Sequence, residues 1–399
     1  MNLKYTAISL GLALALSACS EKDTAATHLT QANAYLTQNK TQESIIELKN
    51  AIKLEPNNSE VRFVLGKVYL DEGDGVNAVK ELEKARMLKY PDDKLLPQLA
   101  RAYLITNSDT ELLELEKKVQ TLSNESKSTY FAYATLANVR SGELEKAKDL
   151  AQSANQAQAG SAMAMLANAY VLLADNEVDK AEGVVKKATN ILADNPDIVM
   201  LNAQIATIQK DYEQAATLYK QYLALQPKSR TTYLMLADVL IKTEGFQEAE
   251  KYVDVILSSV PNQPLANYIK SVIKFAEKDY PAASEFSEKA IQAGNNMPHA
   301  KLVAGTSAFH QQNYEQANYH LESIVKYLKA DHAARKMYAV SQFQLGRVEN
   351  IAEDLADYQP TTEEDAAFLS SLSVNLFNVG AKEEAKKIAE KSTLTEKVS

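Results

Sequence analysis

An apolar pattern that returns every 34 residues constrains the fold of this chain more than any other feature. The clearest copy runs from Ser59 to Asp92 and reads SEVRFVLGKVYLDEGDGVNAVKELEKARMLKYPD. On either side of Gly73-Asp74, apolar and small residues recur three or four apart, which places them on one face of each of two helices joined by a turn. Such a helix pair buries its apolar face only against neighbouring pairs, so the period predicts a stacked array of helix pairs.

Counting from the first residue of each unit, position 8 never holds a bulky side chain and position 20 is small in most repeats. Position 8 holds Ala32, Gly66, Ala100, Thr135, Ala169, Ala203, Ala237, Ser271, Gly305, Ala339 and Ser373. Position 20 holds Ser44, Ala78, Leu112, Ala147, Ala181, Ala215, Ala249, Ala283, Ala317, Ile351 and Ala385, so alanine fills eight of eleven. We expect the two helices of a pair to come closest at these positions, because a large side chain would push the backbones apart.

The residues of this period resemble the tetratricopeptide repeat. The resemblance rests on Leu65, Gly66 and Tyr69 of the first helix, Ala78, Leu82 and Ala85 of the second, and Pro91 near the end of the unit. It implies an all-α fold, a right-handed α-solenoid of about eleven helix-turn-helix repeats. We place repeats 1 to 3 in residues 25–127 and repeats 4 to 11 in residues 128–399, where the 34-residue step holds to the end.

The third repeat, residues 93–126, departs from the pattern in its second half. It has Leu112 instead of a small residue at position 20, and Lys127 is one residue too many before the register resumes. Either this pair is simply degenerate and packs loosely, or it makes a bend in the superhelix. Between the helices of the later pairs we expect the turn to be made by Gly142, Asn176, Asp211, Gly245, Asp279, Asn313, Gly346 and Gly380.

Charge, length and cysteine content limit the ligands and the architectures that this chain can have. The 399 residues carry a net charge of −9, which argues against nucleic acid, since that ligand needs a basic surface that displaces counterions. Length alone suggests two or three globular domains, but the repeats favour one elongated array. The one cysteine, Cys19, leaves no partner for an internal disulfide.

The amino end predicts export and a lipid anchor. Residues 1–18 combine Lys4 with an apolar run from Thr6 to Leu16, which is typical of a secretory signal and too short to span a membrane. The residues before Cys19 resemble the lipobox of bacterial lipoproteins, in which the cysteine is acylated and the chain is cut before it. Residues 19–24 would then be the lipidated tether, and Ser20 favours the outer membrane, facing the periplasm. The alternative is an ordinary signal peptide with a chance cysteine.

No motif for catalysis, a metal or a cofactor is present in the sequence. The five histidines show no HExxH spacing, and CxxC, GxSxG, P-loop and calcium-loop patterns are missing. His310 and His332 could approach each other across repeats 9 and 10, but exposed histidines on separate helices are the favoured interpretation. We therefore predict that the chain is not an enzyme and has no cofactor and no metal site.

The resemblance to the repeat family points to a groove. In that family the first helices line a concave surface, to which positions 2, 5, 9, 12 and 13 contribute. Position 12 of repeats 8 to 11 is phenylalanine each time, and the predicted groove contacts are Tyr268, Val272, Phe275, Phe309, Phe343 and Phe377. They form either an apolar groove for an extended or helical segment of an envelope protein, or packing between adjacent first helices. Curvature decides between the two.

A more specific resemblance covers Cys19 to about Ile105. Residues 46–58, 63–70 and 95–103, with the lipobox ahead of them, are similar to the tetratricopeptide lipoproteins of the PEP-CTERM/exosortase system, which are encoded with exopolysaccharide genes. This implies an outer-membrane scaffold that binds proteins during exopolysaccharide or surface-protein export. Alternatives are a glycan- or peptidoglycan-binding envelope protein, an adaptor for pilus or secretin assembly and, from a third class, an enzyme whose site is assembled from distant repeats.

Overall fold

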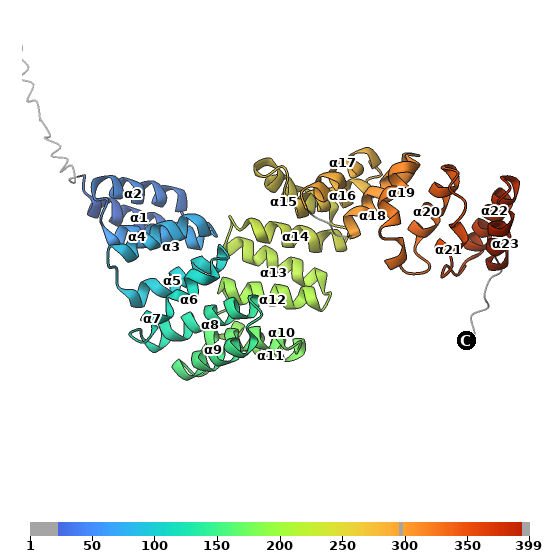
Figure 1. Ribbon diagram of the computed structural model, residues 1–399. Helices are drawn as coiled ribbons and strands as arrows, with labels where there is room; N and C mark the ends of the chain where they lie inside the picture. Colours follow the sequence, from blue (N-terminus) through green and yellow to red (C-terminus); the bar gives the residue numbers. More distant parts are fainter. Residues whose placement is uncertain (1–22, 295–297, 393–399) are drawn as a thin grey trace, which may run out of the picture. The chain divides into compact units, whose positions relative to one another are not determined.

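The computed structural model describes residues 23–294 and 298–392, and within them every regular element is a helix (Figure 1). The helices follow one another as eleven antiparallel pairs in this part of the chain, which confirms the predicted α-solenoid of tetratricopeptide-like repeats. None of the helices in these two ranges is long and apolar enough to cross a membrane. The predicted signal, Cys19 and most of the tether lie outside the described residues.

The contacts divide the chain into two compact units between Ile191 and Leu192. Unit 1 contains repeats 1 to 5, and unit 2 contains repeats 6 to 11. The division falls at the junction of two repeats, where a stacked array has the fewest contacts to lose. The division predicted at residues 127/128 concerns the register of the repeats and stays a prediction.

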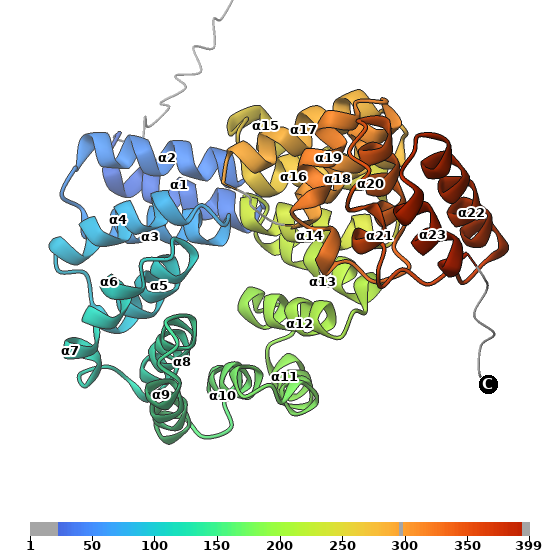
Figure 2. The ribbon, with the colours of Figure 1, turned by 45° about the vertical axis from the view of Figure 1, so that its right-hand side comes forward.

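Unit 1 alternates first and second helices with short turns. Its first helices are α1 (Ala25–Thr37), α3 (Ser59–Asp71), α5 (Asp92–Ile105), α8 (Asn124–Arg140) and α10 (Ala162–Ala174). Its second helices are α2 (Thr41–Leu54), α4 (Gly75–Met87), the short α6 (Asp109–Glu114) with α7 (Glu116–Val119), α9 (Leu144–Ala157) and α11 (Val178–Ile191). The first helices α5, α8 and α10 are successive neighbours (Figure 2).

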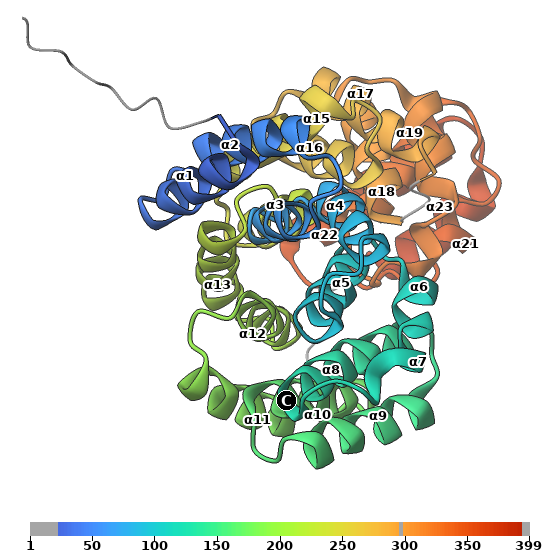
Figure 3. The ribbon, with the colours of Figure 1, turned by 90° about the vertical axis from the view of Figure 1, so that its left-hand side faces the viewer.

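Unit 2 continues the same alternation. Its first helices are α12 (Pro196–Ile208), α14 (Arg230–Lys242), α16 (Pro264–Ala276), α18 (Pro298–His310), α20 (Ala333–Gln344) and α22 (Glu363–Asn378). Its second helices are α13 (Tyr212–Leu225), α15 (Phe246–Ser259), α17 (Tyr280–Gln292), α19 (Tyr314–Glu322), α21 (Ile351–Asp354) and α23 (Lys382–Lys391), and a 3-10 turn η1 (Val325–Tyr327) follows α19. Helices α16 to α19 pack in sequence (Figure 3).

The turn inside each pair has one fixed feature, a left-handed residue at position 15. Positive φ occurs there in all eleven repeats, at Asn39, Gly73, Asn107, Gly142, Asn176, Lys210, Glu244, Lys278, Gln312, Gly346 and Gly380. In repeats 6 to 9 the turn residues predicted from the sequence were therefore displaced by one. Asp211, Asp279 and Asn313 instead cap the second helix, because their side chains accept a hydrogen bond from its third N–H.

The small residues at positions 8 and 20 lie inside the helix pair, as predicted. Every position-20 side chain is buried, from Ser44 in repeat 1 to Ala385 in repeat 11. Two contacts show how close the helices come. A Cβ added to Gly66 would lie 2.7 Å from Cγ of Leu82, at position 24, and Ser373 donates a hydrogen bond of 2.7 Å to the carbonyl of Ala385. Position 8 thus faces both position 20 and position 24 of the second helix.

The expected 34-residue step from residue 128 to the end is seen where the first helices end, at Arg140, Ala174, Ile208, Lys242, Ala276, His310, Gln344 and Asn378, whereas the second helices differ in length. In repeat 10 the second helix has four residues, and in repeat 9 it has nine, against 14 in repeats 4 to 7. The extra residue Lys127 is accommodated inside α8, which has 17 residues. Repeat 10 has the bulky Ile351 at position 20, but repeat 9 has the small Ala317 there, so second-helix length varies for more than one reason while the first helices keep their register.

Candidate functional site

The predicted groove residues lie on four successive first helices of unit 2. Tyr268, Val272 and Phe275 are on α16, and the remaining phenylalanines are on α18, α20 and α22. Tyr268 and Val272 are half-buried against the core of repeats 6 to 8, and Phe343 is half-buried against the core of repeats 10 and 11. Phe275 and Phe309 are also partly buried, whereas Phe377 is exposed, so the four phenylalanines differ in how much of their surface is free.

Two of the phenylalanines contribute to packing between rings. The Phe275 ring lies edge-on to Tyr280 at a centroid distance of 5.6 Å, and Phe309 lies edge-on to Tyr314 at 6.0 Å. Between them His310 stacks flat on Tyr280 at 4.3 Å. Both rings are partly buried and use part of their surface in these contacts, so less of it is free than at an exposed ring.

Phe377 is the member of the set that faces solvent. Its side chain is 59% exposed, as is that of Val374 one turn earlier on α22. The Lys382 ammonium lies 5.9 Å from the centre of the Phe377 ring. Positions 9 and 12 of the last repeat therefore present an apolar surface beside a cation, with little role in the core.

Unit 1 has a hollow on its first helices that sequence patterns did not reveal. It encloses about 390 Å³ between α3, α5 and α8, and its lining includes Phe63, Lys67, Lys94, Gln98 and Thr129. Phe63 and Lys67 stand at positions 5 and 9 of repeat 2, and Lys94 and Thr129 at position 2 of repeats 3 and 4. A scan of polar residues at groove positions, instead of phenylalanines alone, would have found these residues.

Local contacts hold the walls of this hollow. The Phe63 ring stacks on Tyr90 at 4.2 Å, and Lys67 pairs with Asp71 at 2.6 Å. The backbone N–H of Ser123 donates to Asp93 at 2.6 Å, which lowers the pKa of that carboxyl group and ties α5 to the start of α8. Lys94 is exposed, so its ammonium can donate to a carboxylate or carbonyl of a bound segment.

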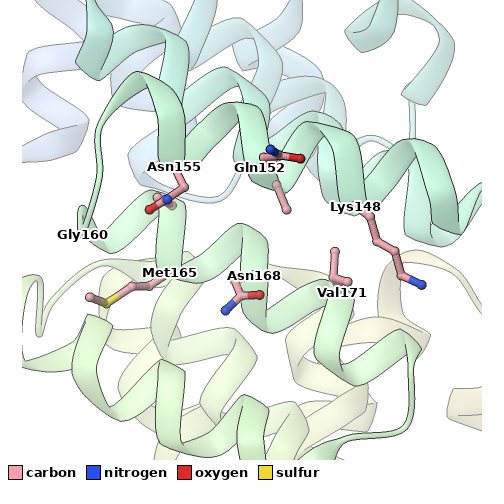
Figure 4. A pocket seen from close by; sticks show the side chains of 9 residues that line it. Lys148, Gln152, Asn155, Gly160, Met165, Asn168 and Val171 are labelled. Carbon is pink, nitrogen blue, oxygen red and sulfur yellow. The ribbon is translucent and has the colours of Figure 1, made fainter.

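A second pocket in unit 1 lies between α9 and α10 and encloses about 510 Å³ (Figure 4). Ala151 stands at position 24, where repeats 1 and 2 have the buried Leu48 and Leu82. Asn168 likewise replaces the leucine that repeats 2 and 3 have at position 7. Smaller and polar residues therefore leave the space open, and the amides of Gln152, Asn155 and Asn168 can hydrogen-bond to a polar group.

The histidines occupy separate environments. His28 lies between two carboxylates, with Nδ1 2.5 Å from Glu47 and Nε2 2.6 Å from Asp23, and the hydrogen bond to Glu47 is the main cause of its raised pKa. His310 stacks on Tyr280, whereas His332 accepts a hydrogen bond from the N–H of Ala334 at the start of α20. Within residues 23–294 and 298–392, no three His, Cys, Asp or Glu side chains gather as metal ligands would.

Comparison with known families agrees with the repeat geometry. A tetratricopeptide repeat model matches residues 29–93, and a second tetratricopeptide repeat model matches residues 206–273. Tetratricopeptide repeats are present in both units. Proteins built from them are generally non-enzymatic scaffolds whose stacked helices form surfaces suited to binding partner proteins or peptides. No curated protein matches the chain.

Several solved structures are similar to the chain at low identity. The PilF protein of Pseudomonas aeruginosa is 20% identical, with a TM-score of 0.46, over 56% of this chain and 99% of that one. The Cut9–Hcn1 hetero-tetramer of APC/C gives 13% identity and a TM-score of 0.48, over 92% and 90% of the two chains. Yeast Tom70 is 16% identical, with a TM-score of 0.37, over 92% of this chain and 99% of that one.

Proposed function

We propose that this protein is a lipid-anchored periplasmic scaffold that holds partner proteins of the bacterial envelope on the first-helix surface of its repeats. The pathway that we favour is exopolysaccharide or surface-protein export, from the resemblance of residues 19–105 to the lipoproteins of that system. The repeats supply the binding surface and no chemistry of their own.

The hollow between α3, α5 and α8 is the observation that carries the proposal. It crosses three consecutive repeats, so a segment that lies along it contacts several first helices at once. Its lining combines an aromatic ring, two lysines, two carboxylates and an amide side chain, which can bind the apolar side chains, charged side chains and main-chain groups of a peptide.

A matched pair of charge reversals tests this surface. Lys94→Glu places a carboxylate in the hollow, whereas Lys80→Glu makes the same change on the exposed side of the second helix α4. Partners would be crosslinked in intact cells, recovered with the protein and quantified against the wild type. We expect recovery to fall several-fold for Lys94→Glu alone. Equal recovery from both variants would exclude the hollow as the binding surface.

A second pair addresses the apolar end of unit 2. Phe377 and Val379 are 59% and 58% exposed, but only Phe377 stands at a groove position. Since an aromatic anchor carries a large share of binding energy, Phe377→Ser should reduce partner recovery by about tenfold or more. Val379→Ser should leave recovery unchanged. The opposite order would place the partner elsewhere on the last repeat.

The anchor is tested by replacing the acylated residue. Cys19→Ser should release the protein from the membrane fraction or block its processing, and labelled fatty acid should enter the wild type but not the variant. A wild-type chain that takes up no label would contradict the lipoprotein part of the proposal, while the two groove experiments would still stand or fall by their own results.

A further inference from the structure

A pocket outside the groove lies where the repeat pattern of unit 2 breaks down. It encloses about 620 Å³ between α17, α18 and α19, within the range typical of small-molecule sites. Glu322 and Ser323, which line it, stand where α19 ends after nine residues, whereas α17 before it has 13. The remaining lining residues are Glu288, Ile291, Gln292, Lys301, Tyr319 and His320.

A buried polar pair fixes one wall of the pocket. His320 is 3% exposed, and its Nε2 lies 2.5 Å from Oε1 of Glu288. Because His320 is on α19 and Glu288 on α17, this hydrogen bond joins repeats 8 and 9 and holds one carboxylate oxygen toward the interior. Glu288 itself is one-third exposed, so the rest of its carboxylate remains available to a ligand.

An aromatic ring is held at the mouth of the same pocket. Tyr319 is 70% exposed, yet its ring lies edge-to-face with the buried imidazole of His320 at a centroid distance of 5.0 Å. This contact restrains the ring while leaving most of its surface uncovered. A restrained and exposed aromatic surface binds a ligand at a small cost in conformational entropy.

We propose that this pocket binds a neutral oligosaccharide. The C–H face of a sugar ring packs on the Tyr319 ring, and its hydroxyl groups can donate to the Glu288 and Glu322 carboxylates. Gln292 offers both a donor and an acceptor, and Lys301 donates to hydroxyl oxygens. The two carboxylates would repel uronate or phosphate groups, so the ligand class is neutral sugars and not anionic ones. The pocket shares no residue with the proposed groove surfaces.

The structure supplies a matched pair of tyrosines for the test. Tyr319 lines the pocket, and Tyr327 is 74% exposed on η1 but does not line it. Binding of cellotetraose, chitotetraose and tetragalacturonate to the purified full-length chain would be measured by saturation-transfer NMR and calorimetric titration. We expect one or both neutral tetramers to bind the wild type and the Tyr327→Ala variant equally.

The variants of Tyr319 decide whether the pocket is the site. Loss of the exposed ring in Tyr319→Ala should weaken binding about tenfold or more, whereas Tyr319→Phe keeps the ring and should retain most of it. Both should unfold at the wild-type temperature, because the side chain is largely outside the core. The proposal is overturned if neither neutral tetramer binds at millimolar concentration, if tetragalacturonate binds in preference, or if Tyr319→Ala and Tyr327→Ala have equal effects.

Discussion

The second helices of repeats 3 and 7 solve the same packing problem in different ways. Position 20 is Leu112 in repeat 3 and Ala249 in repeat 7, and both side chains are fully buried. In repeat 7 the helix α15 runs uninterrupted for 14 residues. In repeat 3 the corresponding segment is broken into α6, with six residues, and α7, with four.

The difference indicates the role of a small residue at position 20. An alanine at position 20 allows the two backbones to approach along a full-length helix, because nothing larger has to fit between them. Leu112 needs more room, and the segment is broken a few residues later. Tyr130 of α8 compensates there, since its hydroxyl donates to the carbonyls of Leu112 and Leu113 at 3.3 and 3.5 Å. Repeat 10 is similar, with buried Ile351 at position 20 and a four-residue helix.

Restoring alanine in the broken repeat should have the largest effect. Leu112→Ala gives repeat 3 the residue that suits repeat 7, but the surrounding chain is already shaped around leucine. The cavity should therefore cost about 2–5 kcal/mol in the free energy of unfolding, measured by urea denaturation. A neutral or stabilising result would mean that the helix can re-form, and that sequence alone maintains the break.

In repeat 10, where the second helix has only four residues, a cluster of polar side chains connects the irregular segment to the next repeat. The carboxylate of Asp365 on α22 accepts hydrogen bonds from the Tyr358 hydroxyl at 2.6 Å and the Lys336 ammonium at 2.8 Å. It also accepts from the N–H groups of Thr361 and Thr362. These partners, Lys336 first, hold the pKa of Asp365 far below its usual range. The irregular segment after α21 is thus anchored to the next repeat by one charge.

The Asp365→Asn variant should lose about 1.5–3 kcal/mol in the free energy of unfolding at neutral pH, because hydrogen bonds to a charged group are lost. The wild type should also be more sensitive to acid. Since folding lowers this pKa, its contribution is complete above the unfolded-state value of about 4 and is lost as pH falls below that value. Urea denaturation between pH 7 and pH 2.5 should show the two proteins converging at low pH. Parallel curves would contradict the role of this charge.

The converse of the first substitution should have a smaller effect. Ala249→Leu overpacks the regular pair of repeat 7 and should cost roughly 1–3 kcal/mol, whereas Leu112→Met, which conserves volume in the broken pair, should cost under about 1.5 kcal/mol. Chemical denaturation of both variants measures the difference. Equal large losses would argue against the register that assigns Leu112 and Ala249 to the same position.

The sequence predicted the helix pairs because their register depends on local and periodic features. Small residues at positions 8 and 20 recur at a fixed spacing, so the starts of α10, α12, α14, α16 and α18 coincide with the predicted starts of their repeats. Second-helix ends are less predictable, since they depend on long-range partners. Asp365, for example, is an ordinary acidic residue in sequence, and only the fold brings Lys336 and Tyr358 to it.

The candidate sites were harder to predict for the same reason. Phe309 and Phe377 occupy the same position of their repeats, but Tyr314 and His310 lie against the ring of Phe309, while Phe377 is 59% exposed. The pair His320 and Glu288 is 32 residues apart and has no spacing that a motif would reveal. Periodicity thus assigns a residue to a helix face, and neighbouring repeats determine whether that face is free.

The smallest effect should come from the turn, where regular and irregular repeats are alike. Position 15 is left-handed in every repeat, yet it is Glu244 in repeat 7, with φ of 59°, and Gly142 in repeat 4, with φ of 76°. A non-glycine residue in this left-handed region is strained by roughly 1–2 kcal/mol, which glycine would relieve. Glycine also makes the unfolded chain more flexible, and this lowers the free energy of unfolding by about 0.4–1 kcal/mol. Glu244→Gly should therefore stabilise the protein by about 0.5–1 kcal/mol.

The reverse exchange in repeat 4 is the matched control. A Cβ added at Gly142 meets no atom within 4 Å, so Gly142→Glu tests the backbone conformation without a steric clash. It should destabilise the protein by about as much as Glu244→Gly stabilises it. Urea denaturation of the two single variants and the double variant measures both changes in the free energy of unfolding, which should add if the two turns are independent of each other. If both exchanges shift stability in the same direction, side-chain contacts at the turn outweigh the left-handed backbone.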